Sequence, residues 1–265
     1  MLYGAKELKL TASGMQFDYI RFGSGKKPLI MIQGLNTRGI KGAALSLAYM
    51  YRIFAKEYTV YLFDRRPVVY DGITVRDMAA DIASSMDALG LKNADVFGTS
   101  QGGMIAQYLA IDRPDLVRKL VLAVTLSRNN DTVKQVVGDW IEMAERGDMK
   151  RFVLDMAEKM YSETYVKKYR PLMPLLTILQ KPKDVKRFVV LAKSCLTCDT
   201  YDILDKIKSP TLVIGGKQDK VVSGVASEEI AEKLSCALHM YENLGHAAYE
   251  EAQDFNQMVY DFLSE

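Results

Sequence analysis

Gly98-Thr99-Ser100-Gln101-Gly102 is the stretch that decides the fold of this 265-residue chain. It follows a short apolar run, Ala94–Phe97, that is typical of a buried strand, and it precedes a helix-like run, Met104–Ala110. A Gly-x-Ser-x-Gly sequence between a strand and a helix is typical of the nucleophile elbow, a strained turn that holds a serine hydroxyl above the edge of a sheet. Glycines flank the serine because Cβ atoms there would collide with the tight backbone. The pattern predicts that Ser100 attacks an electrophilic carbon.

Short apolar runs on both sides of the elbow predict the other strands of a parallel sheet. They are Leu29–Ile32, Thr59–Phe63, Lys119–Thr125, Thr211–Gly216 and Ala237–Tyr241, and a predicted antiparallel pair, Lys6–Leu10 and Met15–Phe22, precedes them. Amphipathic stretches separate the strands, and Val75–Leu89 has apolar residues at helical spacing before Gly90. Helices are also expected over Val225–Leu234 and Asp254–Leu263. This alternation predicts an α/β fold in which helices cover both faces of the sheet.

The composition changes in the second half of the chain, where residues 148–214 contain none of the 18 glycines. Helices are expected over Thr132–Arg146, Met149–Tyr161, Glu163–Gln180 and Asp184–Cys198, with Pro171, Pro174 and Pro182 as kinks or breaks. Because the strand–helix pattern resumes afterwards, we predict that residues 127–205 form a helical cap inserted in a core of residues 1–126 and 206–265. A separate C-terminal domain is the disfavoured alternative.

Large apolar side chains of the predicted cap are expected either to pack on the core or to line an apolar pocket above Ser100. They are Trp140, Met143, Met156, Met160, Tyr161, Leu172, Met173, Leu175 and Leu176. Methionine side chains adapt to varied shapes, which would suit tolerance of several acyl groups.

The overall charge is close to balanced, with 35 Lys and Arg against 33 Asp and Glu. This balance predicts no general affinity for nucleic acid or for an anionic membrane. The N-terminus has no apolar signal sequence and the apolar runs are too short to span a bilayer, so we expect a cytoplasmic protein. Residues 149–193 hold 11 Lys or Arg against 4 Asp or Glu. This excess indicates either solvated helix faces or attraction of an anionic substrate or an acidic acyl-carrier partner.

The cysteines Cys195, Cys198 and Cys236 fit a reducing compartment better than a disulfide framework. Cys195 and Cys198 form a C-x-x-C pair, but it lies in the helix-rich region rather than in a thioredoxin-like βα unit. A zinc site would need about four ligands, and the chain has no second pair. We therefore expect ordinary thiols and no metal site.

A serine nucleophile needs a base, and histidine is the usual one. The chain has only two histidines. His239 lies inside the predicted strand Ala237–Tyr241, whereas His246 follows that strand in a loop. Since such loops form the functional rim of parallel sheets, His246 is the predicted base and His239 a core or surface residue.

The base needs a carboxylate that fixes its tautomer and stabilises the imidazolium ion. Asp219 follows the predicted strand Thr211–Gly216 at the same rim, and the chain order Ser, Asp, His fits the elbow mechanism. A loop aspartate or a helix cap is the plainer interpretation of Asp219. Asp202 and Asp205 precede the strand and are weaker candidates.

A tetrahedral intermediate needs amide donors for its oxyanion. The backbone N–H of Gln101, which follows the nucleophile at a helix N-terminus, is the first predicted donor. The second is the N–H of Leu35, in the loop after the strand Leu29–Ile32, where Gly34 permits a close turn. A plain tight turn is the alternative for this loop.

The chain resembles the α/β-hydrolase family from about Leu8 to Leu263. The resemblance rests on the elbow around Ser100, on Gly216-Lys217-Gln218-Asp219, on Gly245-His246 and on the helical insert. It looks most like the small capped bacterial esterases, lactonases and carbon–carbon hydrolases. The resemblance implies an eight-stranded, mostly parallel sheet, no cofactor, and a triad of Ser100 as nucleophile, His246 as base and Asp219 as acid.

Two positions depart from this resemblance. Many relatives have His-Gly in the oxyanion loop where this chain has Gln33-Gly34, so any orienting role of that histidine is lost. After the strand ending at Asp64, a Gly-rich turn is replaced by Arg65-Arg66-Pro67, so the mouth of the site is expected to differ. Arg65 and Arg66 are expected to form a solvated pair, with contact to a substrate carboxylate as the alternative.

The predicted function is hydrolysis of a small carboxylic ester or lactone through an acyl-enzyme on Ser100. Hydrolysis of a carbon–carbon bond in a vinylogous diketone, by the same residues, is the second hypothesis, and a haloperoxidase- or perhydrolase-like side activity is a further one. Dehalogenase and epoxide hydrolase chemistry is disfavoured because related enzymes have Asp at the position of Ser100. A binding protein on the same fold is the alternative from a different class.

Overall fold

The computed structural model describes residues 2–172, 175, 178 and 181–265. Its sheet has eight strands in the order β1-β2-β4-β3-β5-β6-β7-β8. The strands are β1 (Lys6–Ala12), β2 (Met15–Phe22), β3 (Lys27–Ile32), β4 (Tyr58–Phe63), β5 (Ala94–Thr99), β6 (Val117–Ala123), β7 (Thr211–Gly216) and β8 (Ala237–Tyr241). Strand β2 is antiparallel to β1 and β4, and all other neighbours are parallel. The predicted fold class, a mostly parallel eight-stranded sheet, is confirmed.

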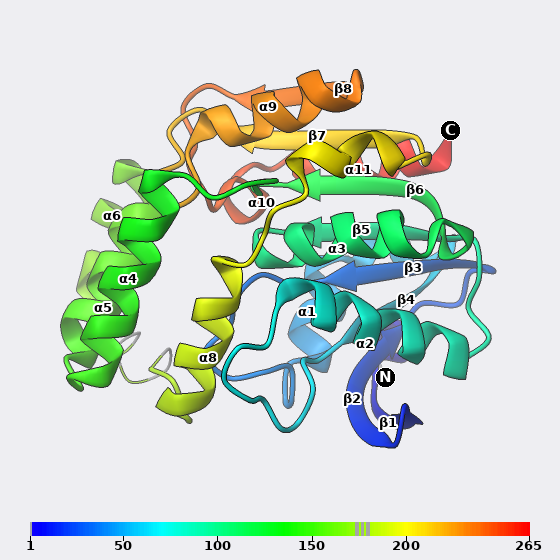
Figure 1. Ribbon diagram of the computed structural model, residues 1–265, viewed down its shortest axis with the longest axis horizontal. Coiled ribbons are helices and arrows are strands. Elements are labelled where there is room, and N and C mark those ends of the chain that lie inside the picture. Colours follow the sequence, from blue (N-terminus) through cyan, green and yellow to red (C-terminus); the bar gives the residue numbers. More distant parts are fainter. Residues whose placement is uncertain (1, 173–174, 176–177, 179–180) are drawn as a thin grey trace.

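Both faces of the sheet are apolar, so helices cover both of them. In β3, Ile30 and Ile32 belong to one buried cluster, whereas Leu29 and Met31 belong to the other. Helices α2 (Val75–Ala88), α3 (Gln101–Asp112) and α9 (Gly224–Leu234) contribute to the first cluster, and α1 (Ala44–Met50) and α11 (Phe255–Ser264) to the second. Figure 1 shows these two layers on either side of the sheet.

Helix α2 illustrates how local sequence sets the bounds of an element. Its N-terminus has a capping box, in which the Thr74 side chain accepts from the Asp77 N–H and the Asp77 carboxylate accepts from the Thr74 N–H. The helix ends at Ala88, and Gly90 follows with φ of +67°, a conformation that favours glycine. The predicted range, Val75–Leu89, differs from the observed one by a single residue.

Between β6 and β7, the described residues include the helices α4 (Asp131–Glu145), α5 (Met149–Met160), α6 (Glu163–Tyr169) and α8 (Val185–Cys195). They lie beyond the carboxyl ends of the parallel strands (Figure 1). Helix α6 is shorter than the predicted helix Glu163–Gln180, because a 3₁₀ turn, Arg170–Leu172, with Pro171 in it, follows Tyr169. Met173, Pro174, Leu176 and Gln180 are outside the described residues. The boundaries of a cap over residues 127–205 stay a prediction.

Two short helices were not predicted from the sequence. Helix α1 exposes Leu45 and Tyr49 and has no capping side chain, so its apolar pattern does not mark a buried face. Helix α10 (Ala248–Glu251) has only 4 residues, too few for a periodic pattern. In the part of the chain that the structure describes, no helix is long and apolar enough to cross a bilayer.

Candidate active site

Ser100 lies at the turn between β5 and α3, with φ of 52° and ψ of −121°. A side chain with positive φ is strained, and the two glycines of the motif make the turn possible. A Cβ atom at Gly102 would overlap the carbonyl oxygen of Ile32, and one at Gly98 would lie 2.5 Å from the carbonyl oxygen of Gly102. Strand β5 and helix α3 therefore lie very close together, and the turn between them directs the Ser100 hydroxyl away from the sheet.

The structure brings Ser100, His246 and Asp219 together from three separate loops. The Oγ atom of Ser100 is 2.9 Å from Nε2 of His246, and Nδ1 of His246 is 2.8 Å from Oδ2 of Asp219. His246 is 3% exposed and Asp219 8%. With Nδ1–H donating to the carboxylate, Nε2 carries a lone pair and accepts from the serine hydroxyl. The arrangement can move a proton from Ser100 to the imidazole.

Backbone groups fix the carboxylate of Asp219. Its Oδ1 atom accepts from the N–H groups of Val221 at 2.7 Å and Val222 at 3.0 Å, which leaves Oδ2 for His246. The loops after β7 and β8 pack backbone to backbone, because a Cβ atom at Gly216 would overlap the carbonyl oxygen of Gly245. This close approach of Gly216 and Gly245 brings the carboxylate to the imidazole.

The other acidic and histidine candidates lie elsewhere. Asp202 and Asp205 belong to the 3₁₀ helix Tyr201–Lys206, which precedes β7, whereas Asp219 follows it. His239 lies in β8 with its ring edge-on to Tyr241 at 4.6 Å between centroids. The structure places His246, and not His239, beside Ser100, and the role of His246 as the base stays a prediction.

The predicted oxyanion donors lie beside Ser100. The loop after β3 passes so close that a Cβ atom at Gly34 would be 3.2 Å from Cβ of Ser100. Leu35 lines the cavity around Ser100, and Gln101 is the first residue of α3. Both positions suit backbone donors at a developing oxyanion, and their role stays a prediction.

The expectation that Arg65 and Arg66 form a solvated pair is wrong. Arg65 is only 6% exposed and donates from Nη2 to the carbonyl oxygen of Gln33. Arg66 instead makes a two-pronged ion pair with Asp81, at 2.7 and 2.8 Å. Neither arginine lines the cavity that contains Ser100. The alternative, in which Arg65 or Arg66 contacts a substrate carboxylate, therefore has no support in that cavity.

Arg65 links the oxyanion loop to α8 through the side chain of Gln101. Its Nε and Nη2 atoms donate to Oε1 of Gln101 at 3.2 and 3.1 Å. The Nε2 atom of Gln101 donates in turn to the carbonyl oxygen of Leu191 and to Oγ of Ser194. Burial lowers the pKa of Arg65 to about 10, so the guanidinium stays charged at neutral pH. Sequence analysis missed this network because its members are far apart in the chain.

Replacing Arg65 with methionine is expected to lower the free energy of unfolding by about 3 kcal/mol, because two buried oxygens would lose their donors. The carbonyl oxygen of Gln33 and Oε1 of Gln101 are those acceptors. The kcat of hydrolysis should also fall, since the loop that carries Leu35 loses its anchor. Urea denaturation and steady-state kinetics measure both effects.

Arg76→Met is the matched control for Arg65→Met. The Arg76 side chain is 58% exposed and pairs with Asp112 at the surface, and such pairs contribute about 1 kcal/mol or less. Equal losses of stability in the two variants would contradict the role given to Arg65.

The three cysteines are free thiols in the structure. Cys195 and Cys198 are buried, and burial raises the pKa of Cys195 to about 11. The same desolvation raises the pKa of Cys198. Buried thiols with raised pKa values are poor nucleophiles at neutral pH.

Several basic residues of the stretch 149–193 have partners within the protein. Lys159 pairs with Asp155 at 2.9 Å, and Arg187 donates to the backbone carbonyl oxygens of Arg66 and Pro67. Attraction of an anionic substrate or of an acidic acyl-carrier partner by this stretch stays a prediction.

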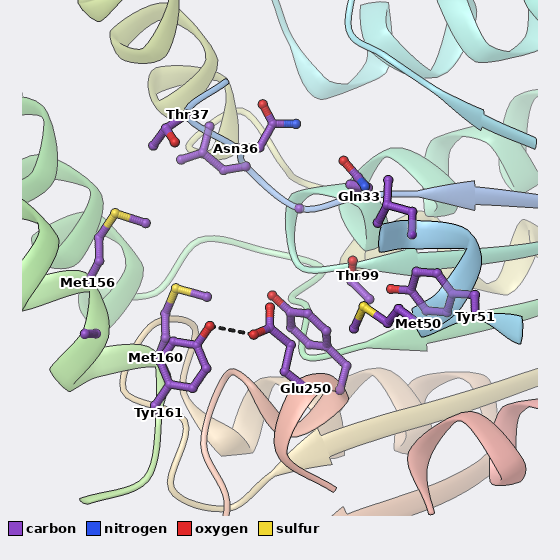
Figure 2. Close-up of a pocket in the computed structure, with 15 residues that line it drawn as sticks. Gln33, Asn36, Thr37, Met50, Tyr51, Thr99, Met156, Met160, Tyr161 and Glu250 are labelled. Carbon is purple, nitrogen blue, oxygen red and sulfur yellow. Dashed lines mark hydrogen bonds between the residues drawn. The ribbon is translucent and has the colours of Figure 1, made fainter. Parts of the chain in front are cut away.

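Two adjoining cavities meet at the candidate site. The inner chamber, bounded by Ser100, Met104, Val137, Trp140, Val222 and His246, has a volume of about 40 Å³. The outer chamber, bounded by Asn36, Tyr51, Met156, Tyr161, Tyr249 and Glu250, has a volume of about 310 Å³ (Figure 2). The two chambers share five lining residues: Gly34, Leu35, Met156, Met160 and Tyr249. Trp140, Met156 and Met160 thus line the apolar pocket expected above Ser100, whereas Leu172 and Leu175 are exposed.

Known proteins share this architecture. A family model described as "alpha/beta hydrolase fold" matches residues 27–149. RutD of Rhizobium rhizogenes, which is named as a carbamate hydrolase, is 27% identical over 239 residues, or 85% of this chain and 90% of RutD. A Paraburkholderia xenovorans protein named 2-hydroxy-6-oxononadienedioate/2-hydroxy-6-oxononatrienedioate hydrolase is 27% identical over 266 residues, or 94% of this chain and 91% of that protein.

A solved structure extends the likeness to the whole fold. The enol-lactonase from Burkholderia xenovorans LB400 matches with a TM-score of 0.84 at 20% identity, covering 97% of this chain and 100% of the other. Fold and site together define a hydrolase of the α/β fold. The family model and these relatives support an α/β-hydrolase family member, and the chain has the α/β-hydrolase fold.

Proposed function

We propose that this protein is a serine hydrolase that cleaves a carboxylic ester or a lactone through an acyl-enzyme. The observation that supports it most is the continuous path from Ser100 Oγ to His246 Nε2 and from His246 Nδ1 to Asp219 Oδ2, at 2.9 and 2.8 Å. A serine hydroxyl becomes a strong nucleophile only when a base removes its proton, and this path provides the base and its orienting carboxylate.

The reaction begins when Oγ of Ser100 bonds to the substrate carbonyl carbon and Nε2 of His246 takes the hydroxyl proton. The carbonyl electron pair moves onto oxygen, where the N–H groups of Leu35 and Gln101 would stabilise it. Collapse of this intermediate breaks the bond to the leaving oxygen, which receives the proton from Nε2. Water then attacks the acyl-enzyme, gives a proton to Nε2, and Ser100 is released with its own proton restored.

Hydrolysis of a carbon–carbon bond is the second candidate, because a relative that covers 94% of this chain is named for it. The substrate in that name is a dioate and carries two carboxylates. Among the described residues that line the two chambers there is no lysine or arginine, and Glu250 adds a negative charge. A dicarboxylate would therefore find no arginine or lysine partner in either chamber, which favours an ester or lactone.

The test uses fluorophosphonate labelling together with a substrate panel. The panel contains p-nitrophenyl esters, lactones and ring-cleavage products of the dioate type, each assayed with the wild-type protein and with Ser100→Ala. We expect covalent labelling at Ser100 and turnover of esters or lactones. Absence of labelling would favour a binding protein, and turnover confined to the ring-cleavage products would favour the second candidate.

A further inference from the structure

The outer chamber contains an acidic side chain whose role the reaction scheme leaves open. Glu250 lies in α10, four residues after His246. Glu250 is exposed to solvent on the side of the chamber, and its side chain lines the chamber wall. Tyr249, its neighbour in the helix, lines the inner chamber as well. A molecule bound at Ser100 can therefore extend past Tyr249 to the carboxylate.

Phenol groups surround this carboxylate. The hydroxyl of Tyr161 donates to Oε2 of Glu250 at 2.6 Å. Figure 2 shows Tyr161 on one side of Glu250 and Tyr51 on the other. Burial raises the pKa values of Tyr51, Tyr161 and Tyr249, so they are neutral donors and aromatic surfaces at working pH.

No cationic side chain faces this carboxylate in the described lining of the outer chamber, which contains no lysine, arginine or histidine. The nearby Glu251 points to a different partner, because its carboxylate accepts from the N–H and the hydroxyl of Ser162. Partial desolvation raises the pKa of the Glu250 carboxyl, and the hydrogen bond from Tyr161 opposes that rise. A carboxylate that has no cationic neighbour in the chamber attracts a cation that enters it.

The chemistry that fits this chamber is that of a protonated amine. An ammonium group would donate to the carboxylate of Glu250 and lie against the rings of Tyr51, Tyr161 and Tyr249, whose faces attract cations. The sulfur atoms of Met156 and Met160 add polarisable surface on the α5 side (Figure 2). A neutral alkyl group of the same size would make the same apolar contacts and leave the carboxylate unpaired.

We propose that the outer chamber is a cation subsite, and that the substrate is an ester bearing a protonated amine on one side of the scissile carbonyl. This inference rests on the proposed ester hydrolysis. Glu250 is the specificity-determining residue, and Ser100, His246 and Asp219 perform the reaction.

The experiment compares cationic esters with neutral esters of the same shape. One pair places the amine on the acyl side: p-nitrophenyl 6-aminohexanoate and p-nitrophenyl heptanoate. The other places it on the alcohol side: 2-(dimethylamino)ethyl butanoate and 3-methylbutyl butanoate. The measured quantity is the ratio of kcat/KM for the cationic ester to kcat/KM for its neutral partner. We expect that ratio to fall by about tenfold to a hundredfold in Glu250→Gln, in at least one pair.

The matched control is Glu251→Gln, which removes the same charge one residue away and outside the lining of the chamber. Its ratio should equal that of the wild type. Glutamine at position 250 keeps an oxygen that accepts from Tyr161, so the variant tests charge rather than packing. An unchanged ratio in Glu250→Gln for both pairs, with all four esters hydrolysed, would overturn the subsite and leave the hydrolase proposal intact.

A binding measurement separates the two proposals if no ester is hydrolysed. Calorimetric titration with n-hexylammonium chloride and with 1-hexanol probes the chamber without any reaction. The subsite predicts tighter binding of the ammonium ion by the wild type and at least about tenfold weaker binding by Glu250→Gln. Equal affinities of the two proteins for the ammonium ion would overturn it.

Discussion

Replacing Ser100 with alanine is expected to lower kcat for ester hydrolysis by at least about 10⁴-fold. The variant loses the atom that forms the acyl-enzyme, so only binding and oxyanion contacts remain to promote attack by water. Fluorophosphonate labelling should disappear with the same substitution. The measurement is steady-state hydrolysis of a p-nitrophenyl ester, with labelling read by intact-protein mass spectrometry.

The stability of the alanine variant provides its internal control. Alanine keeps the Cβ atom of Ser100, which would lie 3.2 Å from a Cβ atom placed on Gly34. The substitution removes only the hydroxyl group. We therefore expect a folded protein whose midpoint of thermal unfolding stays close to that of the wild type. A folded Ser100→Ala protein that retained a tenth of the activity would contradict nucleophilic catalysis by Ser100.

Replacing Asp219 with asparagine is expected to lower kcat by about 10⁴-fold, because the imidazole would hold the wrong tautomer. The carboxylate uses Oδ1 to accept from two backbone N–H groups and Oδ2 to accept from His246. In asparagine, the side-chain carbonyl oxygen can accept from the two backbone N–H groups as Oδ1 does. The side-chain NH₂ group then takes the place of Oδ2 and points at Nδ1 of His246. That nitrogen must then accept, so Nε2 carries the proton and cannot take one from Ser100.

Asp205→Asn serves as the matched control for Asp219→Asn. Asp205 belongs to the 3₁₀ helix that precedes β7. The substitution at position 205 therefore makes the same chemical change at a place away from Ser100 and His246. Its kcat should equal that of the wild type. A loss below about tenfold in Asp219→Asn, measured on a protein with native circular dichroism, would show that another group orients the base.

The fold could be predicted from the sequence because its signals are local. Continuous apolar runs define the buried strands, and the glycine-flanked Ser100 marks a turn in which strand and helix approach closely. The scarcity of histidine left a single residue, His246, in a loop after a strand. The close placement of Ser100, His246 and Asp219 follows from the parallel sheet, whose carboxyl ends meet at one rim.

The parts that sequence analysis missed depend on contacts between distant elements. Arg65 is an ordinary charged residue until the fold buries it against Gln33 and Gln101. Glu250 and Tyr161 are 89 residues apart in sequence and share one hydrogen bond. No local pattern encodes such pairs, because each residue type also suits an exposed helix. The extent of α6 depended on which proline ends it, and Pro171 follows its last residue by two positions.

The end of α5 is fastened to the segment that follows the base by three separate contacts. The N–H of Ala247 donates to the carbonyl oxygen of Met160, Tyr161 donates to Glu250, and Ser162 donates to Glu251. An outward movement of α5 would break all three contacts at once. Two of these contacts are hydrogen bonds to carboxylates. We therefore expect this end of α5 to stay in place when a ligand enters the outer chamber.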